Sequence, residues 1–292
     1  MNENLFAVLG SKIPEFSKGH RKIAEFILSH YDKAAFMTAS KLGDCVGVSE
    51  STVVRFASEL GFEGYPELQK ALQEEMRTRL TAVQRIEVGF DRFGQDEVFK
   101  SVLLHDIDRI RRTLEETKPE DFTSAVDLIV GANRIYIMGI RSSAALASFM
   151  GYYFKLMLPN VTVIETGSRS ELYEQLMHMN ERDVLIGISF PRYSKQTVNA
   201  INYARDVGAK SIAITDRVDS PIAQKADKAL LAKSDMVSFV DSLVAPLSLI
   251  NALIAAVSIQ NKDIVSKNFE MLDRIWEEYE VYEKNGGDSE KI

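Results

Sequence analysis

The spacing of apolar residues along the chain changes near residue 134. Before that point, apolar side chains recur at helical spacing, as at Ile23, Phe26 and Ile27 and again at Leu42 and Val46. This spacing is typical of one face of an amphipathic helix. No alternating strand pattern occurs in residues 1–80. The pattern therefore predicts an all-α domain over residues 1–80.

The segment 81–120 is predicted to join two domains. The run VGFDRFGQDE has two glycines and mixed charge, which favours a linker over residues 81–96. A helix over about Asp96–Thr117 follows, with apolar residues such as Ile107 and Leu114 on one side. Pro119 ends this helix, because a residue that precedes proline disfavours helical backbone.

After residue 134, short β-branched runs alternate with helical stretches. The runs are RIYIMG, VTVIE, DVLIGISF, SIAIT and KALLA. The predicted helices are Asp121–Val130, Ala144–Leu156, Leu172–Met179, Gln196–Val207, Ile222–Ala226, Asp241–Ile259 and an amphipathic segment, Phe269–Tyr279. The alternation predicts an α/β domain over residues 121–280, with a five-stranded parallel sheet in flavodoxin-like order 2-1-3-4-5. Residues 281–292 are predicted to be a disordered tail.

Composition limits the partners and the compartment. The 292 residues suggest two domains, and the net charge of -7 means that any contact with nucleic acid must come from a local patch. Cys45 is the only cysteine, which excludes a disulfide framework and favours a cytoplasmic protein. We expect Cys45 to be a small buried residue. The segment MNENLFAVLGSKIPEF does not have the pattern of a signal peptide. The longest apolar run contains Pro246 and Asn251, so no membrane contact is predicted.

The run VGVSESTVVRFASELGF predicts a helix-turn-helix. Thr38 can cap a helix over Ala39–Val46, and Gly47 can end it. Ser49 can then cap a second helix over Glu50–Leu60. Two short helices joined by a tight turn with glycine make this motif.

The second helix has an apolar side and a polar side. Val53 and Phe56 belong to the apolar side, whereas Arg55 stands with small hydroxyl residues on the other. In a helix-turn-helix, the first residues of the second helix reach base edges. The candidate DNA contacts are Lys41, Ser49, Ser51, Thr52 and Arg55. The alternative is a helical hairpin with a solvated polar face, since residues 1–80 hold ten Lys/Arg against eleven Asp/Glu.

A longer run, TASKLGDCVGVSESTVVRFASELGFEGYPELQKAL, resembles the winged-helix-like domain of the RpiR/MurR family of bacterial transcription regulators. That family has Ser-x-x-Thr-Val-x-Arg-Phe followed by Leu-Gly-Phe-x-Gly-Tyr. Here the two segments begin at Ser49 and Leu60. The resemblance implies operator DNA as a partner.

Two loops rich in hydroxyl groups each follow a predicted strand. Their candidate binding residues are Gly139, Ser142 and Ser143 in MGIRSSAALA, and Ser189, Arg192, Ser194 and Thr197 in ISFPRYSKQT. Strands one and three would flank the crevice of the sheet, and helix N-termini favour anions. The alternative is that these residues are ordinary helix caps.

Residues 121–259 resemble the sugar isomerase (SIS) domain, the usual partner domain in the RpiR family. Its phosphosugar sites have Gly-x-x-Ser after the first strand, matched by Gly139 and Ser142. Its second segment, Ser-x-Ser-Gly-x-Thr, is altered here: relative to that pattern PRY is inserted, and Lys195 replaces the glycine. The resemblance implies an anionic effector such as a phosphorylated sugar.

No residue has a spacing that marks a catalytic base, and neither a metal motif nor a cofactor motif occurs, so no catalytic residue, metal or cofactor is predicted. The leading interpretation is a DNA-binding regulator that senses a phosphorylated sugar. A phosphosugar isomerase with an accessory helical domain is the alternative, and an inactive scaffold is a third. We expect a homodimer or homotetramer, because one recognition helix reads few base pairs. The sequence leaves open the sugar, the operator, and whether the protein represses or activates.

Overall fold

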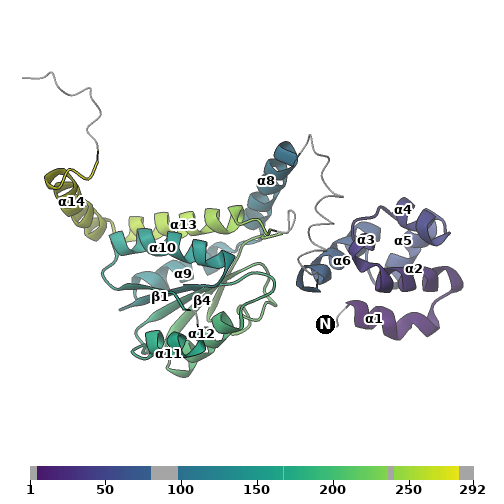
Figure 1. The fold of residues 1–292 in the computed structure, drawn as a ribbon, viewed down its shortest axis with the longest axis horizontal. Helices are drawn as coiled ribbons and strands as arrows, with labels where there is room; N and C mark the ends of the chain where they lie inside the picture. The colour runs from purple at the N-terminus through teal and green to yellow at the C-terminus, as the bar shows by residue number, and fades with distance from the viewer. Residues whose placement is uncertain (1–4, 80–97, 167, 236–239, 283–292) are drawn as a thin grey trace, which may run out of the picture. The chain divides into compact units, whose positions relative to one another are not determined.

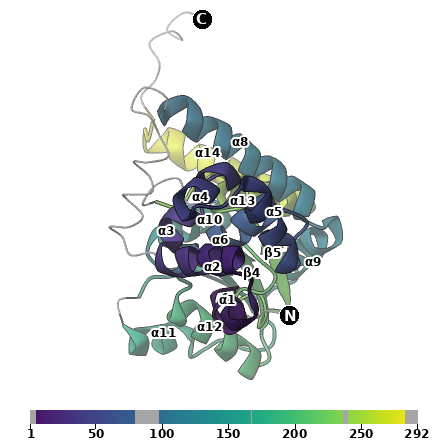
Figure 2. The same ribbon diagram turned by 90° about the vertical axis from the view of Figure 1, so that its right-hand side faces the viewer.

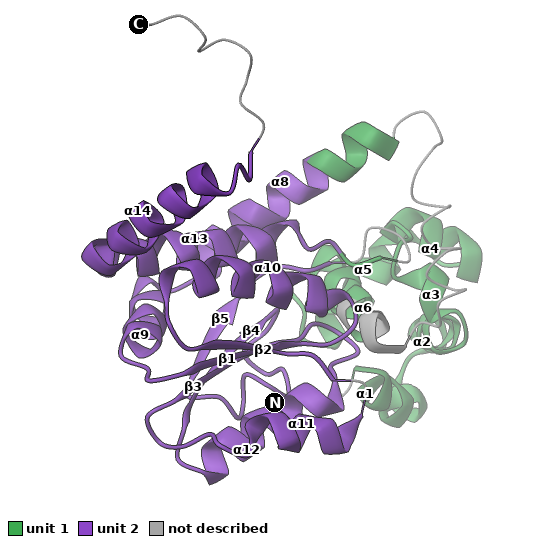
Figure 3. Cartoon of the chain, turned by 60° about the vertical axis from the view of Figure 1, so that its left-hand side comes forward, with its two compact units in different colours: residues 1–103, 236–241 green, residues 104–235, 242–292 purple. Residues whose placement is uncertain are grey.

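The computed structural model describes residues 5–79, 98–166, 168–235 and 240–282 (Figure 1). The predicted linker over residues 81–96 and residues 283–292 of the predicted tail lie outside the described residues. The chain forms two compact units (Figure 3): residues 1–103 with 236–241, and residues 104–235 with 242–292. The predicted domain limits at residues 80, 120 and 280 stay predictions.

All the regular secondary structure that the structure describes in residues 5–79 is helical. Its elements are α1 (Leu5–Lys12), a 3-10 turn (Ile13–Glu15), α2 (Lys18–Ser29), α3 (Tyr31–Ala34), α4 (Ala39–Val46), α5 (Glu50–Glu59) and α6 (Tyr65–Arg79). Helices α2, α4 and α5 pack against one another (Figure 2). Ile23, Leu42 and Phe56 are fully buried where these helices meet. The predicted all-α N-terminal region is confirmed.

Helix α6 holds the segment that leads into α4. The hydroxyl of Tyr65 donates to the carbonyl oxygen of Met37 over 2.8 Å. The Gln69 side chain donates to the same oxygen, and Gln73 donates to the carbonyl of Ala35, each over 2.8 Å. Burial raises the pKa of Tyr65 to about 12. These side chains satisfy carbonyls at the end of a short helix, which otherwise lack partners.

The second unit contains a five-stranded, all-parallel sheet in the order β2-β1-β3-β4-β5. The strands are β1 (Ile135–Gly139), β2 (Val161–Ile164), β3 (Val184–Ile188), β4 (Lys210–Thr215) and β5 (Lys228–Leu231). The helices are α8 (Val98–Glu116, whose first residues belong to the first unit), α9 (Pro119–Val130), α10 (Ser142–Met157), α11 (Arg169–Leu176), α12 (Lys195–Asp206), α13 (Val244–Gln260) and α14 (Lys262–Glu278). The predicted strands and their flavodoxin-like order are confirmed.

Helices cover both faces of this sheet (Figure 1). Ile135 and Ile137 of β1 belong to a core shared with α9, α10 and α13. Tyr136 and Met138, which alternate with them, belong to a core shared with α11 and α12. A strand that is buried on both faces needs apolar residues at every position. This explains why the runs of β1, β3 and β4, which are buried almost throughout, are nearly continuous in apolar residues.

The helix predicted over Ile222–Ala226 is wrong, because the structure has hydrogen-bonded turns there. The backbone N–H of Ala223 donates to the hydroxyl of Ser220 over 3.2 Å. Asp227 accepts from the backbone N–H of Ser211 in β4 over 2.8 Å, which draws the chain directly into β5.

Other helices differ from the prediction only at their ends. Helix α11 begins at Arg169, earlier than predicted, because Ser168 and Glu171 form a capping box. Helix α13 begins at Val244 rather than Asp241. In the described part of the chain, no single helix is long and apolar enough to cross a membrane. Helices α13 and α14 meet that criterion only as a pair, which bends by 98°.

Candidate functional site

Local capping builds the turn between α4 and α5. Thr38 accepts from the backbone N–H of Lys41 over 3.2 Å, and Ser49 accepts from that of Thr52 over 3.3 Å. Gly47 ends α4 with φ 71° and ψ 47°, a left-handed conformation that glycine adopts without steric cost. The predicted caps and turn are confirmed. Together they set the orientation of α5 relative to α4.

Helix α5 presents the two sides expected from its sequence. Val53, Phe56 and Ala57 are buried, whereas Ser51 and Arg55 are exposed. The Nε–H of Arg55 donates to the carbonyl oxygen of Ser51 over 3.3 Å. The guanidinium group therefore lies beside the first turn of the helix, where the motif meets DNA.

Hydroxyl groups gather at the N-terminus of α5. The Ser49 hydroxyl lies 2.9 Å from that of Ser51 and 2.8 Å from that of Thr52. The free backbone N–H groups and the helix dipole at this end favour an anion such as a DNA phosphate. Lys41 is exposed on α4. The structure thus brings Ser49, Ser51, Thr52 and Arg55 together at one helix end.

Cys45 is exposed, so its predicted burial is wrong. The buried residues of α4 are Ala39, Leu42 and Gly43, and Val46 is half-buried. Cys45 does not share the spacing of that face, so its side chain lies outside the core. It lies on the same helix as the exposed Lys41.

The loop between β1 and α10 is tight. A Cβ atom on Gly139 would lie 2.2 Å from the carbonyl oxygen of Ser143, so the close approach requires glycine. Arg141 has φ 58° and ψ -124°, an uncommon conformation for a residue with a side chain. Ser142 is exposed at the start of α10, and Ser143 is buried.

In the loop between β3 and α12, hydrogen bonds link the hydroxyl residues. Ser189 accepts from the backbone N–H of Ser194 over 3.0 Å, and Ser194 accepts from that of Thr197 over 3.4 Å. Ser194 is thus a helix cap, as the alternative interpretation expected. The hydroxyl of Thr197 is fully buried and has no hydrogen-bond partner among the described residues. Buried hydroxyl groups are nearly always hydrogen-bonded, and a bound ligand could supply the partner that this one lacks.

The apparent insertion, PRY, forms an anchored turn. Pro191 is buried, and Arg192 is exposed with φ 65°. The Tyr193 hydroxyl donates to the carboxylate of Asp216 over 2.8 Å, and Asp216 is buried at the end of β4. The anchor keeps Ser189 and Ser194 in contact despite the extra residues. The sequence did not identify Tyr193 or Asp216, because their pairing joins residues far apart in the chain.

The two loops leave the sheet at the same edge. Strands β1 and β3 are parallel neighbours, and Gly139 lies opposite Ile188 in the register. The loops that contain Ser142 and Ser189 therefore follow neighbouring strands at their carboxyl ends. In open α/β sheets, ligands bind at this edge where the strand order reverses.

A pocket of about 240 Å³ lies at this edge, between the ends of β1 and β2. Its polar lining comes from Arg141, Ser148, Glu165 and Thr166. The sequence predicted a crevice between the first and third strands, but it did not predict this pocket. Glu165 and Thr166 follow the second strand directly, which is the signal that could have identified them.

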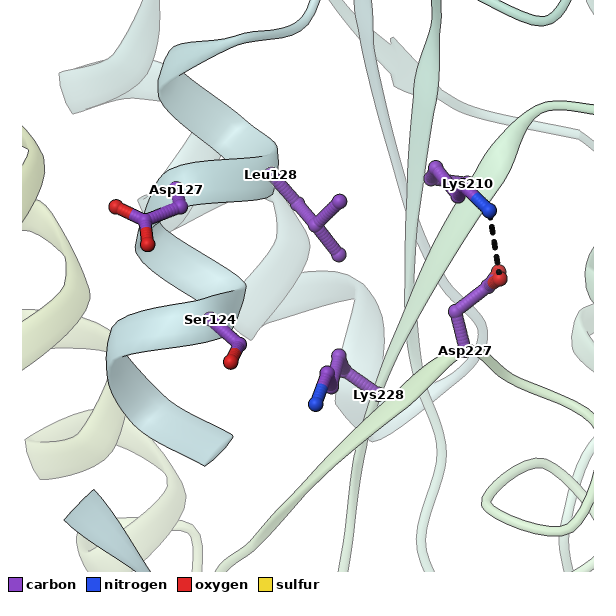
Figure 4. A pocket seen from close by; sticks show the side chains of 6 residues that line it. All are labelled: Ser124, Asp127, Leu128, Lys210, Asp227 and Lys228. Carbon is purple, nitrogen blue, oxygen red and sulfur yellow. Dashed lines mark hydrogen bonds and ion pairs between the residues drawn. The ribbon is translucent and has the colours of Figure 1, made fainter. Parts of the chain in front are cut away.

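A second pocket, of about 480 Å³, lies near the start of β4 and β5 (Figure 4). Lys210 and Asp227 form an ion pair there, with Nζ 3.4 Å from Oδ1. Burial raises the pKa of Asp227, but hydrogen bonds from Ser211 and the ammonium group of Lys210 outweigh that effect and lower the pKa below its usual range. Because Lys210 is already paired, this pocket is a weaker candidate for an anion than the carboxyl edge.

Two further residues that follow β2, Glu171 and His178, do not line the pocket at the carboxyl edge. Glu171 belongs to the capping box of α11, and His178 is exposed. Among the described residues, no group of three His, Cys, Asp or Glu side chains could hold a metal ion.

Each of the two units contains a region that matches a known protein family. Residues 3–79 match the helix-turn-helix domain of the rpiR family, and residues 128–256 match the SIS domain. The chain is similar to the HTH-type transcriptional regulator HexR of Pseudomonas aeruginosa, with 26% identity over 76% of each chain. HexR of Escherichia coli is 28% identical over 78% of this chain and 77% of that protein.

Two solved structures share the fold. The sugar isomerase domain of an RpiR transcription factor from Sphaerobacter thermophilus is 30% identical, covers 61% of this chain and 99% of that chain, and has a TM-score of 0.59. The NanR protein of Vibrio vulnificus, solved with ManNAc-6P, is 20% identical, covers 93% of this chain and 99% of that chain, and has a TM-score of 0.55.

Proposed function

We propose that this chain, which belongs to the RpiR family of helix-turn-helix transcriptional regulators with a SIS domain, binds operator DNA in response to a phosphorylated sugar. The observation that carries the sensing role is the buried hydroxyl of Thr197, which has no partner among the described residues. NanR of Vibrio vulnificus was solved with ManNAc-6P, and we infer a ligand of this class here.

Operator contact is assigned to Lys41, Ser49, Ser51, Thr52 and Arg55. Arg55 is exposed beside the first turn of α5 and can donate two hydrogen bonds to a guanine. The hydroxyl residues and Lys41 can bind phosphates, which set register without reading sequence.

Effector contact is assigned to the carboxyl edge of the sheet. The residues are Gly139, Ser142, Ser143, Ser189, Arg192, Ser194 and Thr197. A phosphate there would accept a hydrogen bond from Thr197 and approach the N-terminus of α12. The sugar would extend toward the pocket lined by Arg141 and Glu165. The ligand can shift operator affinity only if it binds two states of the protein differently.

Arg55→Ala should weaken specific operator binding by about 1–3 kcal/mol, because a base contact is lost. Titration of a labelled operator at several salt concentrations measures this. Lys41→Ala should instead weaken all sequences alike and reduce the salt dependence, because it removes a phosphate contact. Ser58→Ala, on the exposed side of α5 but further from its N-terminus, is the matched control. Unchanged operator affinity of the Arg55 variant would overturn the assignment of the recognition helix.

Thr197→Val should weaken effector binding by roughly 10- to 100-fold, because a charge-assisted hydrogen bond contributes about 1.5–3 kcal/mol. Its melting temperature without ligand should not fall, because the substitution removes a buried hydroxyl that has no described partner. Thermal shifts with inorganic phosphate and a panel of hexose phosphates identify the ligand, and calorimetry gives its affinity.

Ser124→Ala, in the pocket at the start of β4 and β5, is the control for ligand binding. A Thr197→Val protein that binds the ligand as tightly as the wild type would show that the hydroxyl loops are helix caps only. Loss of stability in the same variant, without ligand, would assign the hydroxyl a structural role instead.

A further inference from the structure

The first two turns of α2 form a cationic patch in an acidic chain. Residues 17–24, with the sequence SKGHRKIA, contain Lys18, Arg21 and Lys22 and no carboxylate, whereas the whole chain has a net charge of -7. All three cationic side chains are exposed. A local cluster of this kind on one element is the usual electrostatic footprint of a surface that binds nucleic acid. What the patch can reach depends on where α2 lies relative to the helix-turn-helix.

Two of the three cations are available to a partner. Nη2 of Arg21 donates to the carbonyl oxygens of Pro14 and Phe16, each over 3.4 Å, so this guanidinium group is held by the end of the preceding 3-10 turn. Among the described residues, no ion pair or side-chain hydrogen bond holds Lys18 or Lys22. These two lysines are four residues apart, so they lie on the same side of α2, about one turn from each other.

The start of α2 packs directly against α5 (Figure 2). A Cβ atom on Gly19 would lie 3.4 Å from Cγ2 of Thr52 and 3.7 Å from Cγ1 of Val48, so the two helices leave little space between them here. Nδ1 of His20 lies 2.5 Å from Oε2 of Glu59, near the other end of α5. These contacts fix the start of α2 alongside the second helix of the motif.

This packing places the patch beside the proposed recognition surface. In α5, Arg55 comes three residues after Thr52 and four residues before Glu59, so it is a neighbour of both on the helix surface. The side of α5 that contacts α2 therefore adjoins the side that exposes Arg55. Lys18 directly precedes the glycine that lies against Thr52, and Lys22 comes about one turn later.

The carboxylates near the patch do not cancel its charge. Glu59 is held by His20. Glu50 comes two residues before Thr52, so it lies on the far side of α5 from α2, because successive helical residues are about 100° apart. Glu25 belongs to the next turn of α2 and can offset only one of the three cations. The patch therefore keeps an excess of positive charge.

We propose that Lys18 and Lys22 form a phosphate clamp on the DNA backbone, beside the groove that α5 enters. This inference rests on the proposed operator binding, and it adds a further element, α2, to the contact. An ammonium group on a flexible stem binds a phosphate as a point charge, and such a contact does not read the base sequence. The clamp therefore contributes affinity for any duplex and helps to fix the register of α5 on the bases.

Binding of a labelled duplex at several salt concentrations tests the clamp. The probe is a fluorescein-labelled duplex of random sequence, titrated with the full chain between about 50 and 200 mM salt. Each phosphate contact contributes about 0.9 to the slope of log K against log salt. The Lys18→Gln/Lys22→Gln double variant should therefore lose about 1.8 from the magnitude of that slope. Its melting temperature should not change, because both side chains are exposed.

Two matched double variants isolate the cause. Lys33→Gln/Lys70→Gln removes the same charge from exposed lysines of α3 and α6 and should keep the wild-type slope. Lys18→Arg/Lys22→Arg retains the positive charges and should also keep the slope. A wild-type slope in the glutamine variant of α2 would overturn the clamp. An equal loss of slope in the variant of α3 and α6 would overturn it too, because the effect would then come from total charge.

The Arg55→Ala protein separates the clamp from the assignment of the recognition helix. A duplex selected for tight binding from a random pool serves as the operator. The glutamine variant of α2 should weaken binding of the selected and random duplexes by the same factor, whereas Arg55→Ala should weaken the selected duplex more. Loss of slope in the α2 variant with unchanged selectivity in Arg55→Ala would uphold the clamp and overturn only the recognition helix. A wild-type protein that binds neither duplex would overturn both.

Chemical modification gives a second test that needs no substitution. Acetylation of surface amines, followed by mass spectrometry, should proceed more slowly at Lys18 and Lys22 when the random duplex is bound. The exposed amine of Lys33 should react equally with and without DNA. Equal rates at Lys18 and Lys22 in the two states would contradict the proposed contact.

Discussion

Gly139→Ala should destabilise the second unit by about 3 kcal/mol and abolish effector binding. The added Cβ would lie 2.2 Å from the carbonyl oxygen of Ser143 and 2.7 Å from its carbonyl carbon. Both are backbone atoms, so a rotamer change cannot relieve the clash. Strand β1 is paired with β2 on one side and β3 on the other, which prevents it from moving alone. Overpacking of this kind commonly costs about 1–3 kcal/mol, and more where the backbone is fixed.

Urea unfolding measures the effect. The single tryptophan, Trp276, is half-buried in α14 of the same unit and provides a fluorescence signal. Gly10→Ala in α1 is the control, because a Cβ there has no atom within 4 Å. That control should leave the unfolding transition reported by Trp276 unchanged, because Gly10 lies in the first unit. An unchanged midpoint for Gly139→Ala would mean that the loop adapts and does not need glycine.

Phe56→Ala should destabilise the first unit by about 3–5 kcal/mol, the usual cost of removing a buried aromatic ring. Phe56 is fully buried, with its ring centroid 5.4 Å from that of Phe16 and 5.6 Å from that of His20. Thermal melting followed by circular dichroism measures the loss. Operator binding should be lost at temperatures where the unit is unfolded.

Arg55→Ala, one residue away, is the matched comparison. Arg55 is exposed, so its loss should leave the melting temperature nearly unchanged while operator affinity falls. The two neighbours would then separate the structural and recognition roles of one motif. A Phe56→Ala protein with wild-type stability would contradict the packing described for α5.

The sequence predicted those features that depend on nearby residues. Thr38, Gly47 and Ser49 are local signals for caps and turns, and each acts as expected. The alternation of strands and helices predicted a parallel sheet. The right-handed connections between parallel strands then restrict the strand orders that are possible. The positions of the two hydroxyl loops then followed from the order of the strands.

The features that the sequence did not predict depend on distant contacts. The bond between Tyr193 and Asp216 joins two loops, and Asp227 reaches Ser211 in a neighbouring strand. Helical periodicity identified the apolar side of α8 but could not say which side its own unit buries. Polar partners such as Asp235 decide that, and they lie far along the chain.

Because Cys45 is exposed, the protein can be labelled chemically at this one site. It is the only thiol in 292 residues, and it lies on α4, one helix away from Arg55. A maleimide dye therefore attaches at one defined place without any substitution. Because the first helix of the motif crosses the DNA backbone, such a dye would sit close enough to an operator duplex to report its arrival and departure by a change in fluorescence.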